Sequence, residues 1–114
     1  MFRNVVLDCQ DLERQAAFWA AASGFEQRWT DGTYVMLVDP TQSGPRILLQ
    51  RVSEGKQGKN RLHLDFGAAD MEVEVERLVG LGARRLETRP EYGGFTVMQD
   101  PEGNELCILQ ERPR

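Results

Sequence analysis

The 114-residue chain lacks the features that mark membrane, secreted and nucleic-acid-binding proteins. No apolar run approaches the length of a membrane-spanning helix, and the N-terminus lacks the basic-then-apolar pattern of a signal peptide. The net charge is −4 and the basic residues fall in short groups, whereas nucleic-acid binding normally requires a concentrated basic face. We therefore predict a cytoplasmic protein that binds neither membranes nor nucleic acid.

Cysteine and histidine are also scarce, and this limits the chemistry that the chain can perform. The two cysteines, Cys9 and Cys107, fit a reducing compartment in which both are free thiols. His63 is the only histidine, and a catalytic zinc site usually has three protein ligands. There is no glycine-rich phosphate-binding loop. We therefore expect no cofactor, with a divalent metal as the less favoured alternative.

What the chain does contain is an internal repeat. An apolar strand that runs into an aspartate and then a helix occurs near the N-terminus and again in the middle of the chain. Asn4 and His63 head the two copies, and Asp11 and Asp70 are suitable N-caps for the two helices. Both pairs are 59 residues apart (63 minus 4, 70 minus 11). Such a duplication usually means two copies packed around a shared centre, where a site would lie.

The hydrophobic pattern predicts the same order of elements in both halves: strand, helix, strand, strand, strand. The helices are predicted to end at Gly24 and Gly82, since glycine suits the left-handed residue that closes a helix. Asp31-Gly32 predicts a hairpin turn. The predicted strands span residues 2–9, 25–30, 33–38 and 46–52 in the first half, and 62–67, 84–88, 95–99 and 106–110 in the second.

These patterns predict an α+β fold made of two βαβββ modules. Each module has one helix to cover one face of its sheet, so the opposite faces must be buried on each other or enclose a cleft. We predict that the modules form a curved, half-open, barrel-like sheet with the helices on the outside. Residues 1–114 would form a single domain, with repeat one at about 1–52, a polar linker at about 53–60 and repeat two at about 61–112.

Several stretches resemble the vicinal oxygen chelate superfamily, which includes glyoxalase I, bleomycin-resistance proteins and extradiol dioxygenases. The chain is most similar to small glyoxalase-like proteins, and the resemblance covers nearly its whole length. The matching stretches are Val6-Leu7-Asp8-Cys9-Gln10-Asp11, Ala17-Phe18-Trp19, Asn60-Arg61-Leu62-His63-Leu64-Asp65 and Asp100-Pro101-Glu102-Gly103-Asn104-Glu105-Leu106-Cys107.

The resemblance implies a concave sheet around one site, which in metal-dependent members holds a divalent ion through His and Glu side chains on four strands. The corresponding positions of this chain are depleted of those ligands. Asn4 matches the first histidine position, His63 the second, and Cys107 the last carboxylate. Gln50 is the polar candidate for the remaining carboxylate position, besides Arg46. One conventional ligand of four is kept, so the metal-dependent lactoylglutathione lyase reaction is not expected.

Strand alternation places His63 and Asp65 on one face of their strand, and Asn4 and Asp8 on the matching face of the first. His63 is a candidate general acid or base because the histidine side chain is the usual group for proton transfer near neutral pH; the alternative is a structural histidine. Asp65 would orient it, or would pair with Arg61 or Arg46. Asn4, Asp8, Gln50 and Cys107 are candidate ligand-binding residues. Asp8 could instead tie down the turn before the helix, and Cys107 could be a buried apolar residue.

Two functions follow from this interpretation. The first is an enzyme of lyase or isomerase type that acts on a small carbonyl or cyclic compound, with His63 and Asp65 as catalytic residues. The second is a non-catalytic protein that binds a drug or metabolite, as bleomycin-resistance proteins do. Both require a small-molecule ligand, and family habit together with the open strand edges of such sheets predicts a homodimer.

Overall fold

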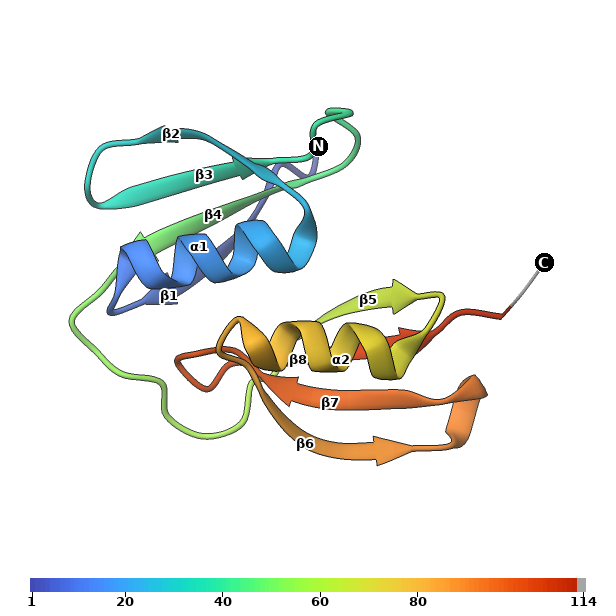
Figure 1. Cartoon of the computed structure of the whole chain (residues 1–114). Helices are drawn as coiled ribbons and strands as arrows, with labels where there is room; N and C mark the ends of the chain where they lie inside the picture. The colour runs from blue at the N-terminus through green and yellow to red at the C-terminus, as the bar shows by residue number, and fades with distance from the viewer. Residues whose placement is uncertain (113–114) are drawn as a thin grey trace. The chain divides into compact units, whose positions relative to one another are not determined.

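A computed structural model describes residues 1–112, and it contains the repeated module twice (Figure 1). The first unit holds β1 (Asn4–Cys9), α1 (Leu12–Ser23), β2 (Glu26–Thr30), β3 (Tyr34–Val38) and β4 (Arg46–Arg51). The second unit holds β5 (Leu64–Ala68), α2 (Met71–Gly80), β6 (Arg84–Arg89), the short 3-10 helix η1 (Glu91–Gly93), β7 (Phe95–Gln99) and β8 (Glu105–Gln110). The predicted α+β class and the two βαβββ modules are confirmed.

Each unit contains one open, four-stranded mixed sheet. The strand orders are β1-β4-β3-β2 and β5-β8-β7-β6, and in each sheet the first pair is parallel while the other two are antiparallel. The chain divides into two compact units between Lys56 and Gln57. Within the described residues, neither helix has the length and apolar character needed to cross a membrane.

The helix N-termini follow the sequence prediction. The Asp11 side chain accepts a hydrogen bond from the backbone N–H of Arg14 (3.1 Å), and Asp70 does the same for Val73 (3.2 Å). The first helix closes at Gly24, whose φ of 76° is left-handed, as predicted.

The second helix also closes at the predicted glycine. Its helical residues end at Gly80, Leu81 is the cap, and Gly82 follows with a left-handed φ of 112°. The backbone N–H of Gly82 donates to the carbonyl of Val79 and that of Ala83 to the carbonyl of Leu78, each at 3.0 Å. This is the usual pattern of a helix that is closed by a glycine just after its cap.

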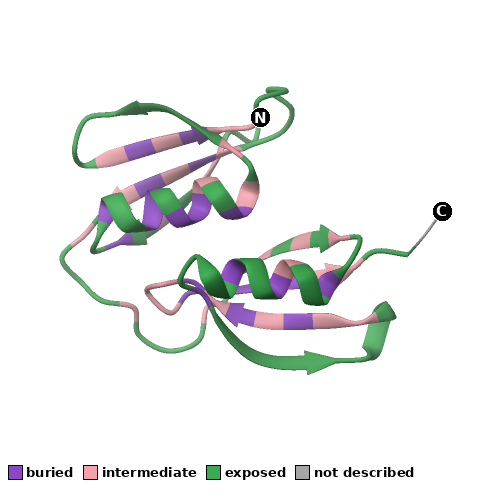
Figure 2. Ribbon diagram, viewed as in Figure 1, coloured by how far each residue is buried: buried purple, intermediate pink, exposed green. Residues whose placement is uncertain are grey.

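The core of each unit lies between its helix and the helix-facing row of its sheet (Figure 2). Burial alternates along β3 and β4, as expected of strands with one covered face. The buried residues of these rows are Val35, Leu37, Ile47 and Leu49 in the first unit, and Thr96, Met98, Leu106 and Ile108 in the second. The alternate row of each sheet therefore faces away from the helix.

The parallel strand pairs of the two units have the same register. Val6 is the partner of Leu48 in the first sheet, and Asp65 is the partner of Cys107 in the second. Asp65 follows Val6 by 59 residues (65 minus 6), and Cys107 follows Leu48 by the same number (107 minus 48). A residue of the first module therefore corresponds to the residue 59 positions later in the second.

Candidate functional site

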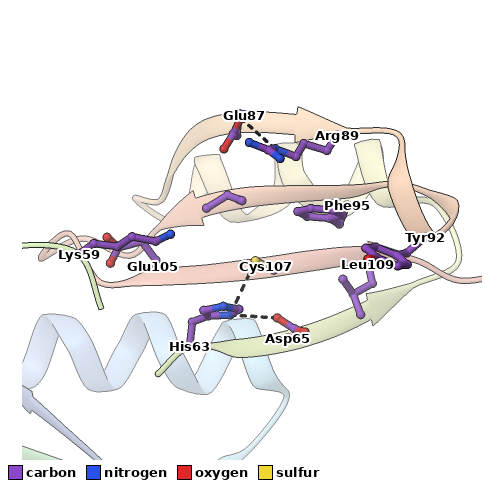
Figure 3. Close-up of a pocket in the computed structure, with 11 residues that line it drawn as sticks. Lys59, His63, Asp65, Glu87, Arg89, Tyr92, Phe95, Glu105, Cys107 and Leu109 are labelled. Carbon is purple, nitrogen blue, oxygen red and sulfur yellow. Dashed lines mark hydrogen bonds and ion pairs between the residues drawn. The ribbon is translucent and has the colours of Figure 1, made fainter. Parts of the chain in front are cut away.

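A cavity of about 530 Å³ lies on the face of the second unit's sheet that points away from α2 (Figure 3). It is lined by the non-helix-facing rows of β5 to β8, together with residues just before β5 and in η1. The lining residues are Lys59, His63, Asp65, Glu87, Arg89, Tyr92, Phe95, Val97, Glu105, Cys107 and Leu109. The volume lies in the range that protein pockets for small organic ligands occupy.

One end of the cavity is polar and is formed by three titratable side chains. Asp65 Oδ1 lies 3.2 Å from His63 Nδ1, and the same nitrogen lies 3.9 Å from Cys107 Sγ (Figure 3). His63 precedes β5 directly, Asp65 is its neighbour on the same face, and Cys107 is the register partner of Asp65 on β8. Two adjacent strands therefore fix the cluster.

Exposure differs sharply across this cluster. About 44% of the His63 side chain and 47% of the Asp65 side chain are exposed, whereas Cys107 is 6% exposed. Burial raises the pKa of the Cys107 thiol, and the neighbouring charge of Asp65 raises it further. The thiol is therefore protonated at neutral pH and is a poor nucleophile without a cation to activate it.

Charged residues surround another part of the cavity. Arg89 Nε lies 3.3 Å from Glu87 Oε2 in an exposed ion pair. Glu105 is 8% exposed, and its Oε2 accepts a hydrogen bond from the backbone N–H of Asn60 (3.2 Å). Lys59 also lines the cavity. Both signs of charge are thus present.

The remaining wall is apolar and aromatic. Phe95, Val97 and Leu109 contribute side chains from β7 and β8, and Tyr92 contributes an exposed ring. Tyr92 has φ 56° and ψ 31°, a left-handed conformation that non-glycine residues seldom adopt. An apolar wall together with a compact polar cluster is the usual composition of a site that orients a small ligand.

The polar end also meets the first requirement for a metal site. One ligand atom each from His63, Asp65 and Cys107 can be chosen so that all lie within 4.8 Å of one another. Three protein ligands are the number found in catalytic zinc sites. The described residues therefore contain a candidate metal-binding triad, and the expectation of no cofactor stays a prediction.

Three of the predicted ligand-binding residues belong to the first unit. Asn4 Oδ1 accepts a hydrogen bond from Arg46 Nε (3.0 Å). Asp8 is exposed and is the register partner of Gln50. The role of these three residues in ligand binding stays a prediction.

Register also identifies the first module's equivalent of Cys107. That residue is Leu48, since it pairs with Val6 as Cys107 pairs with Asp65. Gln50 instead corresponds to Leu109, two residues further along the strand (109 minus 50 is also 59). The three positions that hold His63, Asp65 and Cys107 in the second module hold Asn4, Val6 and Leu48 in the first. The titratable cluster is thus confined to one of the two repeats.

Sequence reasoning missed several residues of the cavity. Glu105 and Leu109 flank Cys107 at a spacing of two on β8, so alternation around Cys107 would have found both. Glu87 and Arg89 lie on β6, which is exposed along its whole length. No sequence pattern distinguishes such residues from an ordinary solvated strand.

The chain belongs to a known family of this architecture. The family model of the glyoxalase-like domain matches residues 4–109. The structural neighbours lie in the glyoxalase, bleomycin-resistance and dioxygenase group, the vicinal oxygen chelate superfamily. The resemblance seen in the sequence is therefore confirmed. No curated protein sequence matches the chain.

Three solved structures illustrate the similarity. A glyoxalase/bleomycin resistance protein/dioxygenase family enzyme from Burkholderia phytofirmans PsJN is 18% identical, with a TM-score of 0.78 over 92% of this chain and 94% of that one. The oxidase ChaP-H2 is 18% identical, with a TM-score of 0.73 over 98% and 94%. A variant of the fosfomycin resistance protein FosX from Listeria monocytogenes, complexed with Mn(II) and a dihydroxypropylphosphonic acid, is 17% identical, with a TM-score of 0.79 over 98% and 90%. At such identities the similarity establishes the fold alone.

Proposed function

We propose that the cavity of the second unit binds a small organic molecule with an apolar body and an oxygen-bearing polar end. Phe95, Val97 and Leu109 would contact the apolar body, while His63 and Asp65 would bind the polar end. The observation that carries the proposal is the contact of 3.2 Å between His63 Nδ1 and Asp65 Oδ1 on the wall of a ligand-sized cavity. Similar proteins that are described as an oxidase and as a fosfomycin resistance protein support a small-molecule ligand.

As an enzyme, the protein would use this pair for proton transfer. In the metal-free protein, His63 takes a proton from a carbon next to a carbonyl group. In an isomerase-type step His63 returns that proton at another position of the same molecule, and in a lyase-type step the electrons of the broken C–H bond expel a group from the neighbouring carbon while His63 gives the proton to the departing group. Asp65 holds the imidazole in one orientation and stabilises its charged form. A divalent ion bound to the same residues would act as a Lewis acid toward a ligand oxygen.

A non-catalytic binding protein is the second candidate. Glu87 and Glu105 together with Tyr92 and Phe95 give the cavity the acidic and aromatic groups that suit a cationic, planar drug. Arg89 and Lys59 oppose this, because they place positive charge on the same wall. The balance of charges therefore favours a polar, rather than a strongly cationic, ligand.

Two measurements on one ligand panel distinguish these functions. The panel contains small carbonyl compounds and cationic aromatic drugs, binding is measured by calorimetry, and proton transfer is measured by deuterium uptake from D2O. For the enzyme, we expect His63→Ala to abolish deuterium uptake while binding stays within about tenfold of wild type. Saturable binding without uptake in the wild type would establish the binding protein. The absence of saturable binding across the panel would contradict both.

A further inference from the structure

We infer that Arg89 binds a carboxylate of the ligand, so that the cavity takes carboxylic acids with an apolar body and a carbonyl group at the opposite end. The inference rests on the proposed function, because it names the chemical class of the ligand in the same cavity. It is carried by a row of residues that crosses the second sheet on the face away from α2.

This row contains one residue from each of the four strands. Arg89 is the register partner of Phe95, and Phe95 is the partner of Leu109. Leu109 is in turn the partner of Gly67. The row therefore runs from a cation, through an aromatic and an aliphatic side chain, to a residue without a side chain. Figure 3 shows Arg89 and Phe95 on the side of the cavity away from His63.

The two ends of the row carry opposite charge. Arg89 supplies the positive end. At the other end the Glu111 side chain lies over Gly67, with its Cδ 2.7 Å from the place where a Cβ of that glycine would stand. Asp65, two residues before Gly67 on the same face of β5, adds a second carboxylate there. A ligand carboxylate would be repelled at this end and attracted to Arg89, whereas a neutral carbonyl group can lie beside His63.

Arg89 can bind a ligand carboxylate in spite of its ion pair with Glu87. Its Nε lies 3.3 Å from Glu87 Oε2, and both side chains are 53% exposed. Ion pairs this exposed contribute little to stability, so replacing Glu87 by a ligand group costs little. A guanidinium binds a carboxylate through two parallel hydrogen bonds. The nearby charge of Glu87 repels a dianion such as phosphate more strongly than a carboxylate.

The distance between the two ends sets the length of the ligand. Arg89 lies on β6 and His63 directly precedes β5, and these are the two outermost strands of the sheet. Three strand spacings of about 4.8 Å separate their backbones by roughly 14 Å. Phe95 and Leu109 line the cavity between them. An acid that reaches both ends therefore needs a ring or a chain of several carbons between its carboxylate and its carbonyl group.

The test measures the binding of four probes to the full chain by calorimetry. The probes are para-acetylphenylbutanoate, its neutral amide, the phosphonate analogue of the acid, and phenylbutanoate, which lacks the carbonyl group. We expect the acid to bind at least about tenfold more tightly than the amide, since a hydrogen bond to a charged group is worth this much. High salt should narrow the difference. The phosphonate should bind more weakly than the acid.

Variants of the ion pair test the role of Arg89 itself. Arg89→Gln should weaken binding of the acid by about tenfold or more and leave binding of the amide unchanged. Arg89→Lys should recover part of the loss, because lysine restores the charge but not the two-point contact. Glu87→Gln should strengthen binding of the acid, because it removes a competing carboxylate. The matched control is Arg85→Gln, since Arg85 lies on the same strand but pairs with Glu72 of α2.

The outcomes separate this inference from the proposed function. Binding of the amide as tight as that of the acid, a phosphonate that binds more tightly than the acid, or equal losses in Arg85→Gln and Arg89→Gln would overturn the inference alone. Binding of phenylbutanoate that depends on Arg89, with no gain from the acetyl group, would support the inference and contradict the role of His63 in the proposed function. Failure of all four probes to bind would overturn both.

Discussion

Asp100 shows how one buried side chain can hold a turn. Its Oδ1 accepts hydrogen bonds from the backbone N–H groups of Glu102 and Asn104, both at 2.9 Å, and its Oδ2 accepts one from Asn104 Nδ2 at 2.9 Å. The residue is 3% exposed. This turn leads into β8, the strand that carries Cys107, so the Asp100 carboxylate holds the chain at the start of that strand.

We expect Asp100→Ala to lower the free energy of unfolding by about 2–4 kcal/mol, because buried donors left without an acceptor each cost about 1–3 kcal/mol. Urea unfolding followed by circular dichroism measures the change. Asp39 is a matched control, since it precedes a proline in the first module and accepts from the backbone N–H of Thr41 in an exposed setting. Its replacement by alanine should cost about 1 kcal/mol or less. Equal losses in the two variants would contradict the account.

At the scale of elements, the two helix caps offer a matched comparison. Asp11 and Asp70 each accept a hydrogen bond from the backbone three residues later, in equivalent positions of the repeat. We expect Asp11→Ala and Asp70→Ala each to destabilise the chain by about 1 kcal/mol, and the corresponding asparagine variants to lose much less. Thermal or urea unfolding provides the values. Alanine variants as stable as wild type would show that the caps contribute nothing.

The ion pair on α2 predicts a pH dependence. Arg77 donates to both carboxylate oxygens of Glu74, at 2.6 and 2.9 Å, and this hydrogen bonding lowers the pKa of Glu74 below its ordinary 4.5. When the pKa of a carboxyl group is lower in the folded than in the unfolded protein, its charged form stabilises the fold at pH values above the unfolded-state pKa. This stabilisation is lost as the pH falls through the folded-state pKa.

We therefore expect Glu74→Gln to cost about 0.3–0.5 kcal/mol at neutral pH, a small value because both partners are partly exposed. The difference from wild type should vanish well below pH 4.5. Urea unfolding across this range measures it, and Arg77→Gln should remove the same pH dependence. A difference that persists in acid would show that packing, rather than charge, is responsible.

For the whole molecule, the repeat made most of the fold predictable. Alternating apolar residues and the paired aspartates gave the order and type of the elements, since these signals are local. Gly24 and Gly82, which both have a left-handed φ, indicated where the two helices close.

The candidate site was less predictable than the fold. Alternation along one strand was enough to put His63 beside Asp65, but the contact with Cys107 depends on the register between β5 and β8. The same kind of register assigns Leu48, rather than Gln50, to the first module's equivalent position. Pairing between distant strands follows from tertiary packing, so a single sequence does not determine it.

A homodimer is our expectation for the molecule in solution. β1 and β2 are the edge strands of one sheet, and β5 and β6 are those of the other, and such edges can pair with a strand of another chain. Light scattering should give twice the chain mass of 13.0 kDa. A single-chain mass at every concentration would contradict this expectation.

We propose above all that an organic ligand occupies the cavity of the second module. The most direct measurement is the change in NMR chemical shifts when the tightest ligand of the panel is added to the full chain. We expect the largest changes at Val97, Cys107 and Leu109, which line the apolar wall and the polar end. A ligand that saturates the protein but leaves the chemical shifts of all three residues unchanged would contradict the account.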